Sequence, residues 1–555
     1  NGVVVVETVK PKIGELRFSY SGSVAMSKPD LSSYNLMNSA EKLEFERLAG
    51  RYDRTATEDI EADITKSEAY NKKLADVQRG VDTYWLSVPL RTGWNHKHNV
   101  YVDGGAGGFM FGIGLNYNGN QGVMQDSNRD SYGGNLDLIY RLDKLQFQNK
   151  FSATYTSTND PIVSFDEYAS ANPYYTKYDE DGNVSRWLEN NNFAKAQNPL
   201  YNASLNSRNK GSKLLLSNYF IAEYMPIDQL KVRAKFGLTH TTDDSEVFLS
   251  PSDTRFDTYD SKLKGSFTSG NEKSTRYDGA LTAIYAQVID KHRFNIAANF
   301  NVSQTKSLEQ GYIARGFPEG NYTYPSFSNG YPEGGVPTYY EDTSRSADMM
   351  GTINYSYDNR YLLDANYALN GSSVFGSNKK FINTWSVGLG WNIMNEKFFR
   401  DAFPGVHMLK IRASIGNPGN QDFSSAMSLV TYRFLYNSFN YFGNSTVLDK
   451  MGNRNLSWQT TTDRNIGLDF RTDRWNFEFD YYDKNTDPLL ISIAVPPSTG
   501  ITTSWHTNLG IQKARGVLAS ATYYILRNLK DRLTWSVRGT LRHENIKLDK
   551  LSGGL

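Results

Sequence analysis

Two histidines are the first residues in this sequence whose types and spacing could do chemistry. His96 and His98 lie two residues apart, so on a β-strand both imidazoles would point to the same side and could bind a metal ion. No third ligand lies near them in the sequence. We therefore expect the pair to be part of a polar strand face.

Two other patterns imitate ligand-binding loops. DEDGN at 179–183 has the carboxylate–glycine spacing of a calcium loop but lacks the glutamate expected at the twelfth position, so it predicts a turn. GGAGGFMFGIG at 104–114 has glycines at dinucleotide-like spacing, but no strand–helix–strand unit follows, so it predicts a turn that enters a strand. No Ser–His–Asp set, HExxH motif or phosphate loop stands out. We expect no enzyme activity, no cofactor and no bound metal.

The elements that would position these residues are strands, because apolar and polar residues alternate through most of the chain. In RLTWSVRGTLRH (532–543), leucine, tryptophan and valine alternate with threonine, serine and arginine, and segments near 145, 230, 409 and 475 repeat the pattern. Such alternation over about ten residues is typical of a strand with one apolar and one polar face, and ten residues span a bilayer when tilted. We expect the charged members to point into a lumen: Arg233, Lys235, Arg412, Glu478, Asp480 and Arg538.

The links between these strands alternate in length. Short links are expected at 142–144, 226–229, 290–292, 358–360, 472–474 and 529–531, and long ones at 158–211, 242–272, 305–345, 417–458 and 486–510. A large soluble β-protein also has alternating strands, but its strands are shorter, with about 5–6 residues. Short turns on one side and long loops on the other indicate an all-β fold, a transmembrane antiparallel β-barrel.

Composition agrees with this fold and excludes other classes. Sixty basic and 59 acidic residues leave a formal charge of +1, which argues against a nucleic-acid-binding protein, and the absence of cysteine excludes disulfides and cysteine metal sites. Aromatic residues make up 14% of the chain, and the mean hydropathy of −0.57 is compatible with a barrel because alternation hides its apolar band. One helix is expected at 32–52, capped by Ser32 or Ser33 and packed on the long loops.

Several long segments resemble the SusC/RagA family of TonB-linked outer-membrane transporters. NGVVVVETVK (1–10) resembles the last strand of the family's plug domain, and YNLMNSAEKLEFERLAG (34–50) its first loop helix. The strongest match is the strand–turn–strand–loop–strand unit at 353–393, and the matches continue at 409–423, 456–470 and 479–490. Two segments depart from the family's pattern: IGNPGNQ (415–421) and NLGIQKARGVLAS (508–520).

The resemblance implies two domains, a last plug strand at 1–10 and a transporter barrel at 11–555. Counting strands between the links yields about seventeen, against the 22 of large plugged transporters. We therefore expect an open, incomplete barrel and a sequence that is a fragment of a protein nearly twice as long. The remaining plug, the signal peptide, the TonB box and the final strands would lie outside it.

The function that the resemblance implies is active import of a nutrient across the outer membrane of a Bacteroidetes-like cell. The substrate would be a glycan or oligosaccharide first and a peptide next. The partners would be the TonB–ExbB–ExbD complex, a SusD-like surface lipoprotein and outer-membrane lipid, without nucleic acid. A siderophore, haem or vitamin receptor and a surface-binding barrel without transport remain the alternatives.

Aromatic residues in the long loops are the candidate substrate contacts, because their flat faces stack on sugar rings. Loop tyrosines also pack on one another or form the aromatic girdle of the membrane interface, so both roles stay open for each. The candidates are Tyr174, Tyr175, Trp187, Tyr322, Tyr324, Tyr436, Tyr441 and Trp505.

Overall fold

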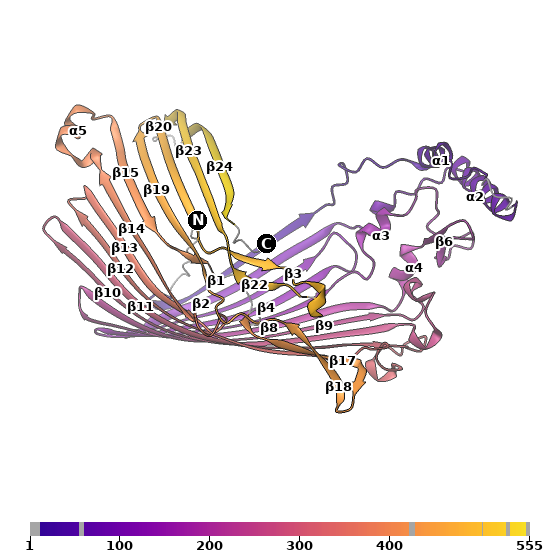
Figure 1. Ribbon diagram of the computed structural model, residues 1–555. Coiled ribbons are helices and arrows are strands. Elements are labelled where there is room, and N and C mark those ends of the chain that lie inside the picture. Colours follow the sequence, from indigo (N-terminus) through magenta and orange to yellow (C-terminus); the bar gives the residue numbers. More distant parts are fainter. Residues whose placement is uncertain (1–10, 55–59, 421–427, 502, 529–532, 551–555) are drawn as a thin grey trace.

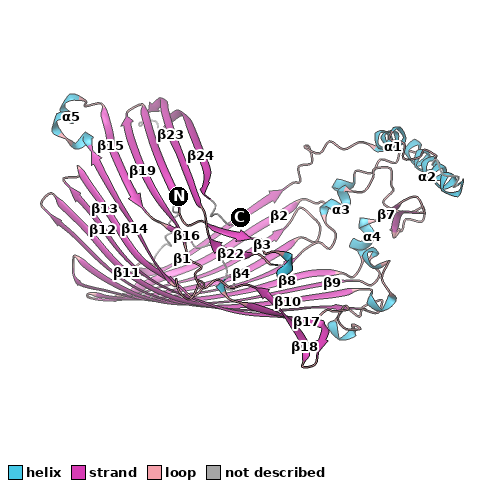
Figure 2. Cartoon of the chain, viewed as in Figure 1, coloured by secondary structure: helices cyan, strands magenta, loops and turns pink. Residues whose placement is uncertain are grey.

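Seventeen long antiparallel strands form one curved sheet in a computed structural model of the chain (Figures 1 and 2). The structure describes residues 11–54, 60–420, 428–501, 503–528 and 533–550, so the expected plug strand at 1–10 lies outside the described residues. Each long strand pairs with the next long strand along the chain. The strands are β1 (Gly14–Ser27), β2 (Gly93–Ala106), β3 (Phe109–Gln121), β4 (Asn128–Leu142), β5 (Leu145–Asn159), β8 (Arg208–Ile227), β9 (Leu230–Leu249), β10 (Ser266–Ile289), β11 (His292–Arg315), β12 (Thr338–Tyr357), β13 (Tyr361–Ser372), β14 (Phe381–Asn392), β15 (Val406–Gly416), β19 (Gln459–Thr472), β20 (Trp475–Thr486), β23 (Ile511–Asn528) and β24 (Leu533–Lys550).

The sheet is open over the part of the chain that the structure describes. Within that part, β1 pairs with β2, β24 pairs with β23, and no pairing joins β1 to β24. The strand count and the open sheet were both predicted from the links, and both are confirmed.

Small elements gather at the long-loop end of the sheet. Figure 1 shows α1 to α4 and the β6–β7 and β17–β18 hairpins there, whereas α5 lies at the opposite end with the short turns. None of the helices in the described ranges is both long and apolar enough to cross a membrane. Their bounds are α1 (Ser39–Leu48), α2 (Ile60–Gln78), α3 (Phe165–Ala169), α4 (Pro199–Ser204), α5 (Lys397–Ala402), β6 (Trp187–Asn190), β7 (Lys195–Gln197), β16 (Gly419–Asn420), β17 (Thr431–Asn440), β18 (Gly443–Lys450), β21 (Leu490–Ile493) and β22 (Trp505–Asn508).

The pairing register keeps apolar and polar residues on opposite faces of the sheet. One row of directly paired residues is apolar: Ile411, Leu468, Phe479, Ala519 and Leu541. The next row points to the other side and is polar: Lys410, Asp469, Glu478, Ser520 and Thr540. Because side chains alternate along each strand, these rows define an apolar face and a polar face. The register places all six charged residues predicted for the lumen on this polar face.

Two link predictions were too long. Pairing of β9 with β10 continues to Leu249 and Ser266, and pairing of β11 with β12 continues to Gly311 and Thr338, so these loops are shorter than expected. The added strand ends are polar on both sides and therefore show no alternation, as in TSGNEKST (268–275). Backbone pairing alone extends them.

The expected helix at 32–52 is also shorter. It is α1, of ten residues, and its cap is Asn38 rather than Ser32 or Ser33. The Asn38 side chain accepts a hydrogen bond from the backbone N–H of Glu41, and the Glu41 carboxylate accepts one from the backbone N–H of Asn38. This reciprocal pair satisfies two amide donors that a helix start leaves free.

The two sequence patterns that imitate ligand-binding loops, GGAGGFMFGIG and DEDGN, form turns, as predicted. Gly107 and Gly108 connect β2 to β3 with φ angles of 58° and 87°, which glycine adopts without strain. In DEDGN, the Asp179 carboxylate accepts hydrogen bonds from the backbone N–H groups of Asp181 and Asn183.

Candidate functional site

A buried ionic network joins the loop helices to the long loop between β5 and β8. Lys73 of α2 is 5% exposed, and its Nζ lies 2.9 Å from a carboxylate oxygen of Glu189 in β6. The ammonium is surrounded by four aromatic rings, with centroids 5.0–6.0 Å from Nζ: Tyr52, Tyr174, Tyr175 and Phe193. An ammonium in such a ring of π-faces is stabilised electrostatically.

A second buried carboxylate, Glu46 of α1, holds the same network from the other side. It accepts hydrogen bonds from the hydroxyls of Tyr52 at 2.7 Å and Tyr174 at 3.0 Å. Burial, with these acidic neighbours, raises the pKa of both tyrosines above the ordinary range, so they stay neutral donors. Burial alone would raise the pKa of Glu189, but hydrogen bonds from Tyr175 and Lys73 outweigh it and the pKa lies below its usual value.

Beside this network lies a polar cleft of about 320 Å3. Three of the predicted contact residues meet at it: Tyr174, Tyr175 and Trp187. Tyr174 is only 1% exposed and Tyr175 is also buried, so their rings and hydroxyls serve the packing of the loops. Trp187 is half-buried at the cleft, where a ligand contact remains a prediction.

The other predicted aromatics lie in separate loops. Tyr322 is exposed and packs edge-on against Phe327 of its own loop, and exposed Tyr324 lies beside the Arg208 guanidinium. Tyr441 is 96% exposed at the turn between β17 and β18. Trp505 begins β22 and is half-buried, whereas the side chain of Tyr436 lies outside the described residues. Ligand contact by these residues remains a prediction.

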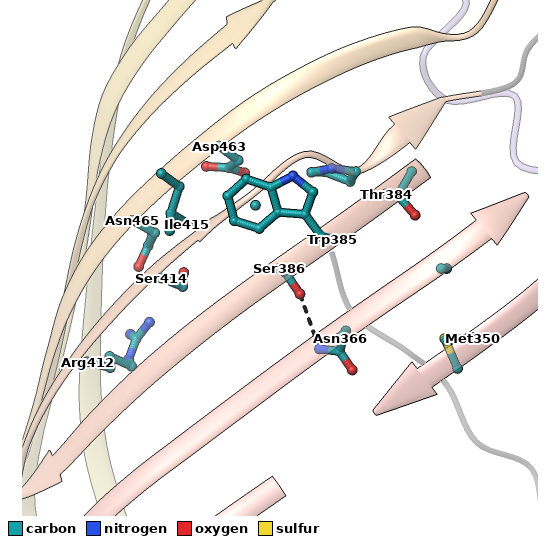
Figure 3. A pocket seen from close by; sticks show the side chains of 13 residues that line it. Met350, Asn366, Thr384, Trp385, Ser386, Arg412, Ser414, Ile415, Asp463 and Asn465 are labelled. Atoms are coloured by element: carbon teal, nitrogen blue, oxygen red, sulfur yellow. Dashed lines mark hydrogen bonds between the residues drawn. The ribbon is translucent and has the colours of Figure 1, made fainter. Parts of the chain in front are cut away.

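A larger pocket, of about 570 Å3, lies on the sheet at the loop end of β13, β14, β15 and β19 (Figure 3). Amide and hydroxyl groups of the polar face contribute to its lining, and Asn366 donates a hydrogen bond to the Ser386 hydroxyl at 3.1 Å. Met350, Trp385 and Ile415 also border it. Pro418, at the start of the 417–458 segment, lies at the pocket, so this long loop leaves the sheet beside it.

The charges of this pocket are compensated inside the sheet. The Arg412 guanidinium forms two hydrogen bonds to Asp480, at 2.6 and 2.8 Å, and lies 3.2 Å from Asp469. The Asp463 carboxylate lies 3.4 Å from the Lys484 ammonium through Oδ2, while its buried Oδ1 accepts no hydrogen bond within the described protein. The charged side chains of the pocket are therefore paired with opposite charges, and the pocket carries little net charge.

Sequence reasoning named Tyr174, Tyr175, Trp187 and Arg412 but missed the other residues of both sites. The helix α2 that carries Lys73 has a visible signal, since IEADITKSEAYNKKLADVQ (60–78) is rich in helix formers and lacks glycine and proline. Asn366 and Asp463 occupy polar positions of predicted strands, but their convergence on one pocket has no sequence signal.

The prediction for the two histidines was wrong about the face. His98 pairs with Gly22 and Tyr117, and His96 with Val24 and Gly119, which places both on the apolar face. The hydroxyl of Tyr20 lies 2.7 Å from Nδ1 of His98. Side chains alternate along β2 as expected, but near the loop end of this strand polar residues occupy the apolar face, where Trp94 also lies.

Comparisons with known proteins agree with this architecture. The family model described as "TonB dependent receptor-like, beta-barrel" matches residues 171–550. The TonB-dependent receptor SusC of Bacteroides thetaiotaomicron is 24% identical, over 100% of this chain and 55% of that protein. A TonB-dependent receptor of Formosa agariphila is 25% identical, over 97% of this chain and 49% of that protein.

Among solved structures, the RagAB peptide transporter matches with a TM-score of 0.79 and 20% identity, over 99% of this chain and 63% of that chain. The chain spans about half the length of the curated relatives it matches. The polar and apolar faces of the sheet are thus the lumen and lipid faces of an outer-membrane barrel. The chain belongs to the TonB-dependent receptor β-barrel family and is of the SusC/RagA type.

Proposed function

We propose that this barrel imports a neutral, hydroxyl-rich nutrient, a glycan or oligosaccharide first and a peptide second. The observation that carries the substrate class is the charge-compensated pocket of Figure 3, where amide and hydroxyl side chains stand beside apolar ones. An anionic ligand would need an uncompensated cation, but Arg412 is held by two carboxylates.

The position of the pocket supports capture from the outside. It opens at the loop end of the strands, next to the 417–458 loop, whose β17–β18 hairpin exposes Tyr441, Phe442 and Phe439. Exposed aromatic faces on the loop that starts at the pocket suit a sugar, which presents both apolar ring faces and hydroxyls.

The proposed energy source and partners follow from location and family. An outer membrane holds no ion gradient of its own, so uptake against a gradient would draw on the inner membrane through TonB–ExbB–ExbD. The similarity to SusC and to RagAB supports a SusD-like surface lipoprotein as the second partner. RagAB is itself a peptide transporter, which is why peptide is retained as the second substrate class.

The test is uptake by cells that make the full-length protein. Labelled oligosaccharides, peptides and a ferric siderophore are compared for the wild type and for N366L/N465L, which fills the pocket with apolar groups. The control N99L/N116L changes two paired asparagines of the polar face on β2 and β3, away from the pocket. We expect N366L/N465L to lose uptake of a neutral substrate at least tenfold, because each buried polar partner lost costs about 1–3 kcal/mol. Uptake of the siderophore alone, or equal loss in the control, would contradict the proposal.

Deleting TonB separates import from surface binding. An importer loses accumulation but keeps ligand at the cell surface, whereas a non-transporting barrel shows the same bound amount with and without TonB.

A further inference from the structure

Three cations lie side by side on the lipid face of the sheet. Lys273 of β10, Lys306 of β11 and Arg345 of β12 are all exposed. Lys306 pairs with Thr275 and Thr343, two positions from Lys273 and Arg345, so each of the two is a diagonal neighbour of Lys306 on one face. Diagonal neighbours in a sheet are about 7–8 Å apart, within common reach of long side chains.

These cations mark the loop-side end of the apolar band. Moving toward the loops along this face, each of the three strands carries mostly apolar or aromatic residues and then reaches its cation. The successive outward residues are Leu281, Gly279, Tyr277, Thr275 and Lys273 on β10, Phe300, Val302, Gln304 and Lys306 on β11, and Met349, Ala347 and Arg345 on β12. The cations therefore lie where the hydrocarbon of the outer leaflet meets its headgroups.

No carboxylate neutralises them. Among the described residues, none lies within 4.0 Å of these three side chains, and Arg345 donates its Nε–H to Gln304 at 2.7 Å. The nearest acids on this face are one pairing step closer to the loops and have their own donors: Asp244 accepts from Asn271, and Glu341 from the hydroxyl of Tyr339.

Three other cations at the loop-side edge of the apolar band are compensated. On β19, β20 and β23, Arg464 and Arg515 lie 3.9 and 3.1 Å from Asp483, and Lys513 lies 2.6 Å from Asp549. The uncompensated trio is therefore a local feature of β10 to β12, on strands held rigid by continuous pairing along at least twenty residues.

We propose that Lys273, Lys306 and Arg345 bind the phosphate of an anionic lipid headgroup in the outer leaflet. Their N–H donors come from three neighbouring strands on one face, and phosphate oxygens accept charge-assisted hydrogen bonds from several donors at once. The lipid is favoured over free phosphate because the band below the cations receives the acyl chains.

The full-length protein in neutral detergent is titrated with a phosphatidic acid, with phosphatidylcholine and with inorganic phosphate, and bound molecules are counted by native mass spectrometry. The test variant is K273Q/K306Q/R345Q. The matched control, R464Q/K513Q/R515Q, removes the same charge from the same face. Heat-modifiable gel migration verifies that both barrels assemble.

We expect one phosphatidic acid to bind the wild type and the control tightly. The test variant should bind it on the order of a hundredfold more weakly, since each basic residue near an anionic lipid contributes about fivefold. Equal affinity of the test variant and the control would overturn the site. Equal binding of phosphatidylcholine would overturn the role of the anion, and inorganic phosphate bound as tightly as the lipid would overturn the lipid as its source.

Discussion

Replacing Lys73 with methionine should loosen the loop cluster without unfolding the barrel. Methionine fits among the four rings that surround the ammonium, so the lost interaction is the ion pair with Glu189. Removing one partner of a buried pair costs about 3–5 kcal/mol because a buried charge is left unpaired. Glu189 keeps hydrogen bonds from the Tyr175 hydroxyl and the Asn191 amide, so we expect the lower end, about 3 kcal/mol.

Hydrogen exchange of the α2 amides, followed by mass spectrometry on the full-length protein, measures this change. A loss of about 3 kcal/mol raises the open population of the cluster roughly a hundredfold. The double variant K73M/E189Q removes both charges while the glutamine still accepts from Tyr175, so it should recover most of the protection.

An exposed pair on α1 provides the control. Arg47 and Glu44 form a hydrogen-bonded ion pair with half-exposed side chains, so R47M should change exchange only slightly. The assignment of Lys73 and Glu189 as the cluster's central ion pair would be refuted if the α2 amides exchanged as slowly in K73M as in R47M. It would also be refuted if they exchanged as fast in K73M/E189Q as in K73M.

Three further outcomes are expected. Folding lowers the pKa of Glu189, so the stability that its carboxylate contributes is present above its ordinary pKa and is lost as pH falls through the lowered value. Tryptophan-detected melting of the loops between pH 7 and pH 3 should show this loss of stability in the wild type and not in E189Q. Arginine at Leu468 should reduce barrel assembly in membranes by about 2–4 kcal/mol, whereas arginine at Asn465 on the lumen face should be tolerated, as judged by heat-modifiable migration. Deleting 417–458 should abolish growth on the imported nutrient while the barrel still assembles, and unimpaired growth would remove this loop from capture.

The strand architecture was determined by the sequence itself. Alternation over ten residues is a local property, because neighbouring side chains on a strand must point to opposite sides, and it assigned Arg412, Asp480 and Trp535 to their faces correctly. Short and long links then defined the two ends of the barrel and the strand count.

Alternation fails where a strand leaves the membrane. The two histidines lie on the apolar face instead of the predicted polar one. The polar ends of β9 to β12 looked like loops, because only pairing with a neighbouring strand holds them extended. Local sequence does not report that pairing.

Tertiary structure decided which residues form sites. Lys73 and Glu189 are 116 positions apart and meet only because α2 packs against the long loop between β5 and β8. Asp463 and Asn366 share one pocket only because three strand pairings connect β13 to β19. The sequence left Tyr174 and Tyr175 open between ligand contact and packing within the loops, and their burial makes them the walls of an ionic core. Burial and convergence depend on contacts between segments far apart in the chain, which alternation and composition do not encode.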